Sequence, residues 1–413
     1  MRVQRCKGTR DLTPQEMAKF RLIEEAFRDS CLKWGYDEVR TPTLEYLHLF
    51  TSTGTLTPGM LGRVYTFLDW DGWSGERVVL RPDGTIPVAR FYIDTVAEKK
   101  LARFFYVTNI FIFEPTGKET REKWQCGAEL IGASSAVADA ELVTLALDVL
   151  KRLGLEGVEL RLSHAGLIKA LLKELGLSPR EQTRIFDQIL DGNMESLAAV
   201  KPARLELGRV LTSLLELKGE SSGFLKNLKA LFPADLPELN ASLDDFINVA
   251  GVLDALGYDY EIDVASKGFE YYTGVIFEFF ICDEKIGGGG RYDALIPLVG
   301  GEDVPASGFA LYLDPLMNLV KPEALAKPLA QRVLIRTEPE AIKEGFGIAN
   351  CLHEAGISAE LSLVGQELSG LRWTLDVSNG PLYILTDRIK RRKFELKTAG
   401  ELLAVLKGSK GSS

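Results

Sequence analysis

The sequence predicts an α+β fold, in which an antiparallel sheet is flanked by helices, a helical insertion interrupts it, and a smaller α/β domain follows. The sheet is indicated by two long, mostly apolar segments, residues 103–114 and 122–133, which flank a Pro-Thr-Gly turn as paired antiparallel strands do. The insertion is indicated by residues 165–256, where Leu, Lys and Glu recur at helical spacing and strand signals disappear. From residue 331 onward strand and helix patterns alternate, which is typical of an α/β domain.

The first element is a helix over residues 13–34. Thr13, the proline after it and Glu16 form the sequence pattern of a capping box. Apolar side chains then recur at helical spacing until Gly35 ends the helix. A short strand is expected at residues 37–41. The apolar stripe of the helix fits packing on the sheet of its own chain or on a second subunit, and the sequence leaves both open.

The remaining elements of the larger domain are indicated by short apolar runs bounded by Gly, Pro and Asp. Strands are expected at residues 64–68, 77–80, 158–163, 260–264, 275–282 and 306–313, and helices at residues 85–100 and 136–153. Asp314 and Pro315 are expected to cap a short helix. Four consecutive glycines, residues 287–290, favour a hairpin turn when they are taken alone, because glycine adopts turn conformations readily.

The C-terminal domain is expected to alternate strands with helices. The strands are expected at residues 332–337, 357–364 and 382–386, and the helices at residues 339–355, 366–378 and 401–407. Prolines bound a linker at residues 322–328, so we predict a core of residues 1–325, with its insertion at about 165–256, and a second domain of residues 326–413. The tail from residue 408 is expected to be disordered.

Composition excludes several function classes. The net charge of −9 argues against broad nucleic-acid binding, which needs a basic surface. Five scattered cysteines without a CxxC pair and only three histidines indicate neither a disulfide framework nor a metal site. No apolar run approaches the roughly 20 residues of a membrane helix, and the first residues lack the apolar core of a signal peptide. The expected location is cytoplasmic, without membrane association.

Two pairs of polar residues are candidates for a ligand pocket. Asp83 and Thr85 lie at a strand-to-helix corner, where Asp83 would also serve as an ordinary N-cap. Gln125 and Glu129 are four residues apart on one expected strand, so their side chains share a face, which is turned toward a ligand or toward solvent.

A third pair is aromatic. Tyr271 and Tyr272 belong to residues 267–274 (KGFEYYTG), which lead into an apolar strand and then into residues 287–293 (GGGGRYD). Adjacent strand positions place one ring on each face, so one phenol is available to a pocket; plain aromatic packing is the alternative. Together the two segments resemble the histidine-recognition segment of histidyl-tRNA synthetases, and the resemblance spans nearly the whole chain.

This resemblance implies a class II aminoacyl-tRNA synthetase-like antiparallel sheet, a dimer built on the first helix, and an anticodon-binding-like C-terminal domain. It also implies a pocket for L-histidine, because the RPDGT run at residues 81–85 is similar to an RPEGT run of the family. The implied histidine-binding residues are Asp83, Thr85, Gln125, Glu129, Tyr271 and Tyr272. Asp83 is one methylene shorter than the family's glutamate.

Amino-acid activation needs fixed cations, because charge builds on the α-phosphate and the pyrophosphate, and the bidentate fork of arginine suits it best. By resemblance, three arginine positions are altered and one basic residue is kept. Ile112 replaces the arginine of an FRxE motif, Lys267 replaces the histidine-specific arginine, Pro315 replaces one that opens a helix, and Arg121 remains. Each lost donor costs on the order of 3 kcal/mol in the transition state, so this vestigial ATP site is predicted to lack adenylation.

This pattern resembles the synthetase paralogue that serves as the regulatory subunit of ATP phosphoribosyltransferase. The resemblance implies a non-catalytic protein that binds L-histidine for feedback control of the first step of histidine biosynthesis. It would be a homodimer within a hetero-oligomer with the short-form catalytic subunit, without cofactor or metal.

Two alternatives stay open: a divergent histidyl-tRNA synthetase, and a non-catalytic module that binds tRNA or a partner. The C-terminal domain keeps the synthetase alternative open. tRNA is not an expected partner, because the basic cluster in residues 390–393 is interpreted as a solvated loop, with RNA contact as the second interpretation.

Overall fold

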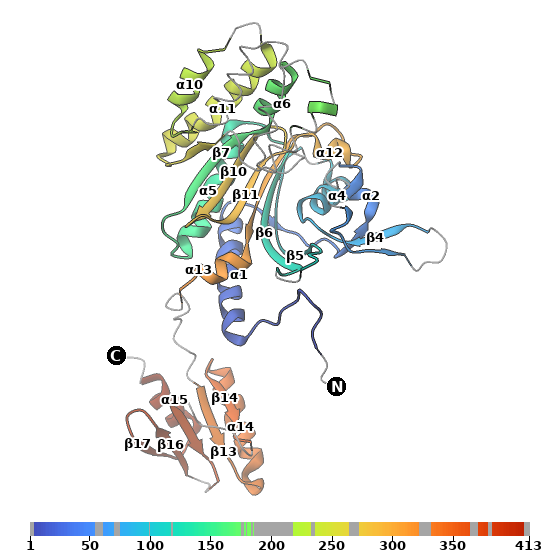
Figure 1. Ribbon diagram of the computed structural model, residues 1–413. Helices are drawn as coiled ribbons and strands as arrows, with labels where there is room; N and C mark the ends of the chain where they lie inside the picture. Colours follow the sequence, from blue (N-terminus) through green and yellow to red (C-terminus); the bar gives the residue numbers. More distant parts are fainter. Residues whose placement is uncertain are drawn as a thin grey trace. The chain divides into compact units, whose positions relative to one another are not determined.

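The computed structural model divides the chain into two compact units, Met1–Lys321 and Pro322–Ser413 (Figure 1). The described residues are 4–53, 61–69, 75–98, 100–116, 119–174, 177–178, 180–182, 185, 218–232, 236–263, 272–321, 332–363, 371–378 and 382–408. The expected linker at 322–328, most of the middle of the insertion and the tail after residue 408 lie outside these residues.

Among the described residues, nine strands form the main sheet of the first unit in the order β1-β5-β6-β12-β11-β10-β7-β9-β8. Their bounds are β1 (Asp37–Glu38), β5 (Ala102–Phe111), β6 (Glu122–Ile131), β12 (Ala306–Tyr312), β11 (Glu284–Arg291), β10 (Val275–Ile281), β7 (Glu159–His164), β9 (Glu261–Asp263) and β8 (Lys218–Gly219). The pairs β1–β5 and β7–β9 are parallel and the others antiparallel. The antiparallel sheet predicted from the sequence is confirmed.

The hairpin of β5 and β6 shows why the two sheet faces differ. Its register pairs Ala102 with Ile131 and Phe111 with Glu122. Because side chains alternate along a strand, Phe105 packs in one core cluster and Phe104 in the other. The first cluster includes side chains of α1 (Pro14–Lys33) and α5 (Ala136–Arg152), and the second those of α4 (Thr85–Val96). The α4 side carries the polar residues of the candidate site.

Helix α1 begins where the sequence predicts. The Thr13 side chain accepts a hydrogen bond from the Glu16 N–H at 3.3 Å, and the Glu16 carboxylate accepts one from the Thr13 N–H at 2.7 Å, which completes the capping box. Phe20, Ile23 and Phe27 are buried against the sheet of their own chain. The apolar stripe therefore has a partner within the chain.

Shorter elements complete the first unit. A small antiparallel sheet has the order β2-β4-β3, and three short helices, α2, α12 and α13, belong to the same unit. These elements are β2 (Leu44–Tyr46), α2 (Leu47–Thr51), β3 (Thr66–Leu68), β4 (Arg77–Leu80), α12 (Leu295–Leu298) and α13 (Leu313–Leu319). Among the described helices, none is both long and apolar enough to cross a membrane.

The glycine run is not a hairpin turn, contrary to the prediction from the run alone. Gly287 to Gly290 lie inside β11, a central strand between β10 and β12. The turn lies earlier, at Cys282 and Asp283, which have φ angles of 50° and 62°. A Cβ at Gly287 would lie 2.7 Å from the carbonyl oxygen of Ala310, so the close approach of the strands requires glycine there.

The described part of the insertion is helical, as predicted, apart from one short strand. It contains α6 (Ala165–Glu174), α10 (Ser222–Lys229) and α11 (Pro237–Leu256), and α11 contacts α5, α6 and α10 (Figure 1). The prediction that strands are absent is wrong at β8, which pairs with β9 at the edge of the main sheet. Gly257 ends α11 with a φ of 75°, a conformation that glycine adopts without strain.

The C-terminal unit has a mixed sheet in the order β14-β13-β15-β16-β17. Its elements are β13 (Arg332–Arg336), η2 (Pro339–Ala341), α14 (Ile342–Glu354), β14 (Ser358–Leu361), β15 (Trp373–Asp376), β16 (Tyr383–Asp387), β17 (Arg392–Leu396) and α15 (Ala399–Gly408). The β13–β14 and β13–β15 pairs are parallel, and the other two are antiparallel.

Two predictions for this unit are wrong. The helix expected at residues 366–378 is contradicted by β15, where Trp373 and Leu375 alternate into the core with the period of a strand. The basic cluster expected to form a loop lies partly in β17, since Arg392 pairs with Asp387 of β16. Arg391, with a φ of 51°, makes the turn.

Candidate functional site

The candidate site is centred on Glu129, whose side chain points from β6 toward the α4 side of the sheet. The residue is 1% exposed. The Tyr106 hydroxyl donates to one carboxylate oxygen at 3.1 Å, and the Tyr292 hydroxyl donates to the other. The Gln125 side-chain amide donates to the Tyr106 hydroxyl at 3.3 Å, and the Thr85 hydroxyl lies 3.5 Å from the same oxygen. Buried side chains from four separate segments thus converge on one carboxyl group.

Burial raises the pKa of Glu129 to about 8, and the nearby Asp83 carboxyl adds to the rise, while hydrogen bonds from Tyr292 and Thr85 oppose it. Near neutral pH a large share of Glu129 therefore keeps its proton. A bound cation would offset the cost of ionising this carboxyl, so the pocket is suited to a ligand with a positively charged or hydrogen-bonding ring.

The prediction that Asp83 would serve as the N-cap is wrong in position, because Gly84 is the N-cap of α4 and Asp83 precedes it. The Asp83 carboxylate accepts a hydrogen bond from the Ile86 N–H at 2.8 Å, at the start of α4. Burial raises its pKa to about 6, against the lowering effect of hydrogen bonds from Ile86, Thr85 and Gly84. Asp83 also raises the pKa of Glu129, which places the two carboxyls within electrostatic reach of each other. Contact with the first turn of α4 and a ligand role are therefore compatible.

Tyr272 forms the aromatic wall of the site. It is 5% exposed, and its ring centroid lies 6.4 Å from that of Tyr292, with an interplanar angle of 37°. A Cβ at Gly290 would lie 2.9 Å from the Tyr272 ring, so glycine is required under this ring. Tyr271, the other tyrosine of the predicted pair, lies outside the described residues. The geometry therefore brings Asp83, Thr85, Gln125, Glu129 and Tyr272 to one site.

Sequence reasoning missed Tyr106 and Tyr292. Tyr106 pairs directly with Gly127 in the β5–β6 register, and a Cβ at Gly127 would overlap the Tyr106 ring. The sequence signal that could have found Tyr106 is a large ring paired with a glycine, Gly127, which lies on the same strand face as Gln125 and Glu129. Tyr292 is the tyrosine of the GGGGRYD run, to which no separate role was assigned.

The predicted phosphate half of the site is poor in available positive charge among the described residues. Ile112 is partly buried, and its N–H donates to the Arg121 carbonyl at 2.9 Å. The Arg121 guanidinium lies 4.5 Å from the centroid of the Phe113 ring and donates to the Glu114 carbonyl at 2.9 Å. Arg121 is therefore held by its own hairpin. Lys267 lies outside the described residues.

Helix α13 begins two residues earlier than predicted. Tyr312 is its N-cap and makes no side-chain capping bond, so the prediction that Asp314 caps this helix is wrong. The Asp314 carboxylate instead pairs with Arg10, and Pro315 sits in the first turn. On the sheet face, Lys285 of β11 pairs with the buried Glu278. These cations are already matched by carboxylates.

The described residues contain no group of three or more His, Cys, Asp or Glu side chains arranged to hold a metal ion. The polar groups of the site are carboxyl, amide and phenol groups, which bind an organic ligand through hydrogen bonds.

Comparisons with known proteins identify the family to which the chain belongs. The family model for histidyl-tRNA synthetase matches residues 8–316. A protein of Dehalococcoides mccartyi named ATP phosphoribosyltransferase regulatory subunit is 54% identical over 407 residues, which are 98% of this chain and 99% of that protein. The chain belongs to the ATP phosphoribosyltransferase regulatory subunit family. This family is a histidyl-tRNA synthetase-like paralogue, as the resemblance in the sequence predicted.

More distant relatives include histidyl-tRNA synthetases. A protein of Methanocaldococcus jannaschii named histidine–tRNA ligase is 34% identical over 385 residues, which are 91% of this chain and 89% of that protein. A structure from Bacillus halodurans, described as an ATP phosphoribosyltransferase regulatory subunit/histidyl-tRNA synthetase, has a TM-score of 0.74 at 25% identity and covers 89% of this chain and 93% of its own.

A histidyl-tRNA synthetase structure from Nostoc has the same TM-score of 0.74 at 18% identity, with 98% of this chain and 99% of that chain covered. These likenesses confirm the class II synthetase-like α+β fold. A regulatory role follows for this chain from the names of its family members.

Proposed function

We propose that this regulatory subunit binds L-histidine in the site around Glu129 and passes feedback control to a short-form catalytic ATP phosphoribosyltransferase subunit. One observation carries the proposal: Glu129 is buried and accepts hydrogen bonds from two tyrosine hydroxyls, Tyr106 and Tyr292, and burial raises its pKa to about 8. A buried carboxyl group in this setting can accept a hydrogen bond from an imidazole ring or form an ion pair with its protonated form.

The remaining residues suit the other end of the ligand. The α-ammonium group of histidine needs acceptors, and the Asp83 carboxylate and the Thr85 hydroxyl lie at the same site as Glu129. The Gln125 amide, 4% exposed, can both donate and accept. A ligand without matching groups would leave buried polar atoms unpaired, at about 1–3 kcal/mol for each. This arrangement favours histidine over apolar amino acids of similar size.

Activation chemistry is not part of the proposal. Adenylation would need cations at the positions of Ile112 and Pro315, and neither side chain carries charge. The kept basic residue, Arg121, is engaged by Glu114 and Phe113 of its own hairpin. The chain also offers no residue to which we assign phosphoribosyl transfer. The chain is therefore proposed to catalyse no reaction of its own. It is further proposed to act as a homodimer within a hetero-oligomer and not to bind tRNA.

We expect no histidine-dependent exchange between ATP and pyrophosphate above background, because the transition-state charge has no arginine partners at residues 112 and 315. The measurement compares the purified protein with an active histidyl-tRNA synthetase. The same preparation should be stabilised against thermal unfolding by millimolar L-histidine but not by L-leucine, since a ligand stabilises the state that binds it.

Robust exchange would overturn the regulatory proposal and favour the divergent synthetase, the second candidate that the 34% identity to histidine–tRNA ligases supports. Absence of any stabilisation by histidine would overturn the sensor role. A third measurement tests the partner: adding this protein to the short-form catalytic subunit should form a larger assembly in analytical ultracentrifugation, and histidine should lower the phosphoribosyltransferase activity of that assembly.

A further inference from the structure

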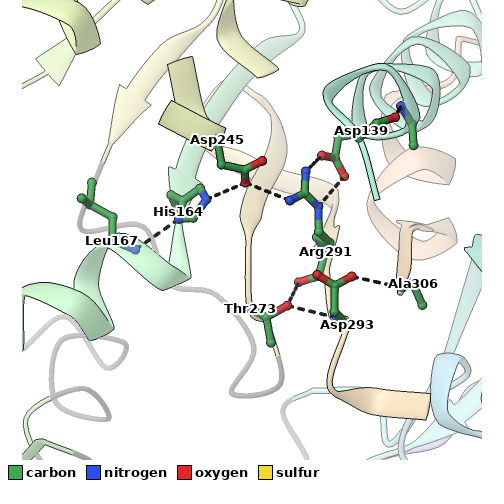
Figure 2. Close-up of polar contacts among 10 residues, drawn as sticks. Asp139, His164, Leu167, Asp245, Thr273, Arg291, Asp293 and Ala306 are labelled. Carbon is green, nitrogen blue, oxygen red and sulfur yellow. Dashed lines mark hydrogen bonds and ion pairs between the residues drawn. The ribbon is translucent and has the colours of Figure 1, made fainter. Parts of the chain in front are cut away.

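A buried ion network lies behind the candidate site and is centred on Arg291, the last residue of β11 (Figure 2). Its guanidinium pairs with the Asp139 carboxylate of α5, which is 1% exposed, and with Asp245 of α11 at 2.9 Å. Asp245 in turn lies 3.0 Å from the Nε2 atom of His164, the last residue of β7. One arginine therefore joins the central sheet to the longest described helix of the insertion.

The hydrogen bonds around His164 assign its tautomer. The Nδ1 atom accepts a hydrogen bond from the Leu167 N–H at 3.1 Å, so this nitrogen carries no proton. The proton of the neutral ring is then on Nε2, which donates to Asp245. His164 is thereby a fixed link that orients Asp245 toward Arg291. It is not free to act as a base, because both ring nitrogens are engaged.

The same arginine also holds the edge of the pocket. Its carbonyl oxygen accepts a hydrogen bond from the Thr273 N–H at 2.8 Å, next to Tyr272. The Asp293 N–H donates to the Thr273 hydroxyl at 3.0 Å, and the Asp293 carboxylate accepts from the Ala306 N–H at 3.2 Å. Tyr292, between Arg291 and Asp293, is thus fixed on both sides while its hydroxyl donates a hydrogen bond to Glu129.

We propose that Arg291 is a positioning residue that couples helix α11 of the insertion to the ligand pocket, so that occupancy of the pocket is passed to the insertion through Asp245. A movement of α11 would shift the Arg291 guanidinium through Asp245. The backbone of Arg291 holds Thr273, next to Tyr272 in the segment before β10, and is continuous with Tyr292. The inference rests on the proposed function only in naming L-histidine as the ligand.

The test uses two neighbouring aspartates of α11. Asp245→Asn removes the charge that faces Arg291, whereas Asp244→Asn makes the same change on the adjacent residue, which pairs at the surface with Lys229 of α10. We expect Asp245→Asn to weaken L-histidine binding about tenfold in calorimetry, within the usual range of coupling between sites, and Asp244→Asn to leave it within about twofold.

Hydrogen exchange supplies readouts that a general loss of stability would not reproduce. Histidine should slow exchange in α11 of the unchanged protein and of Asp244→Asn, but not of Asp245→Asn. Without ligand, Asp245→Asn should speed exchange of the Thr273 and Asp293 amides. Val249→Ala, which opens space in the buried face of α11 and changes no charged group of the network, should lower the melting temperature yet keep histidine affinity.

The outcomes distinguish failure of the proposed histidine binding from failure of the proposed coupling through Arg291. Failure of histidine to bind the unchanged protein would overturn the proposed function, and the ligand-free exchange of Thr273 and Asp293 would still decide the positioning role. If Asp245→Asn matches Asp244→Asn in affinity and exchange, or if Val249→Ala weakens binding as much as Asp245→Asn, the coupling through Arg291 is wrong.

Discussion

Replacing Glu129 with glutamine is expected to weaken L-histidine binding about 100-fold, because the amide cannot become the anion that the imidazole ring requires and one buried hydrogen bond is reversed. The same change is expected to stabilise the ligand-free protein at pH 8. Burial raises the pKa of Glu129 from 4.5 to about 8, so ionisation favours the unfolded chain. A neutral glutamine avoids this effect, for a gain of about 4 kcal/mol at pH 8.

The pH dependence has a definite sign. Between pH 4.5 and pH 8 the folded protein holds a proton on Glu129 that the unfolded chain releases. Stability from this group is therefore fully present below pH 4.5 and is lost as the pH rises through about 8. Asp83, with a pKa of about 6, acts in the same direction at lower pH. The Glu129→Gln variant should show a shallower decline across this window.

Urea unfolding at pH 5 and pH 8, combined with calorimetric titration of L-histidine, measures both effects. The matched control is Glu122→Gln on the same strand, where a partly exposed carboxylate accepts from Asn109 at 2.8 Å. This control should change neither binding nor the pH profile. Equal unfolding free energies for the Glu129→Gln variant and the unchanged protein at both pH values would show that Glu129 is ionised in the folded state.

Alanine at Gly308 is expected to abolish measurable histidine binding and to destabilise the protein by about 3 kcal/mol. Its Cβ would overlap the Glu129 carboxylate, lie 2.6 Å from the Tyr292 hydroxyl, and lie 2.7 Å from the Ala128 carbonyl oxygen. The side chains could move only by breaking the bond between Tyr292 and Glu129, and the carbonyl belongs to the neighbouring strand β6 and cannot move independently.

Gly251→Ala is the control for this substitution. Gly251 lies in α11, and a Cβ there would have no neighbour within 4 Å. Because alanine favours helix more than glycine, this variant should gain up to about 1 kcal/mol and keep its histidine affinity. Thermal and urea unfolding with histidine titration would measure both variants. A Gly308→Ala protein that binds histidine normally would show that the ligand lies elsewhere.

Local patterns predicted much of the larger unit. The capping box of α1 depends on Thr13 and Glu16, three residues apart, and forms as expected. Alternation along β6 places Gln125 and Glu129 on one face, as their spacing predicted. Such features depend on contacts within a few residues, which the sequence displays directly.

Errors arose where distant neighbours decide the outcome. Trp373 lies in a strand because β13 and β16 flank it, although the pattern of its segment predicts a helix. The glycine run taken alone predicts a turn, but these glycines let β11 lie close to β10 and β12 on either side. Propensity is a weak guide in both cases, because tertiary contacts outweigh preferences of a fraction of a kcal/mol.

The sequence by itself determined the fold class, the family resemblance, and the residue types at the site, because these depend on local pattern and on identity at single positions. Only the tertiary structure decided that Tyr106 and Tyr292 hold Glu129, and that Arg291 meets Asp139, 152 residues away. The charge state of a buried group depends on every neighbour that replaces water around it, and those neighbours come from distant parts of the chain.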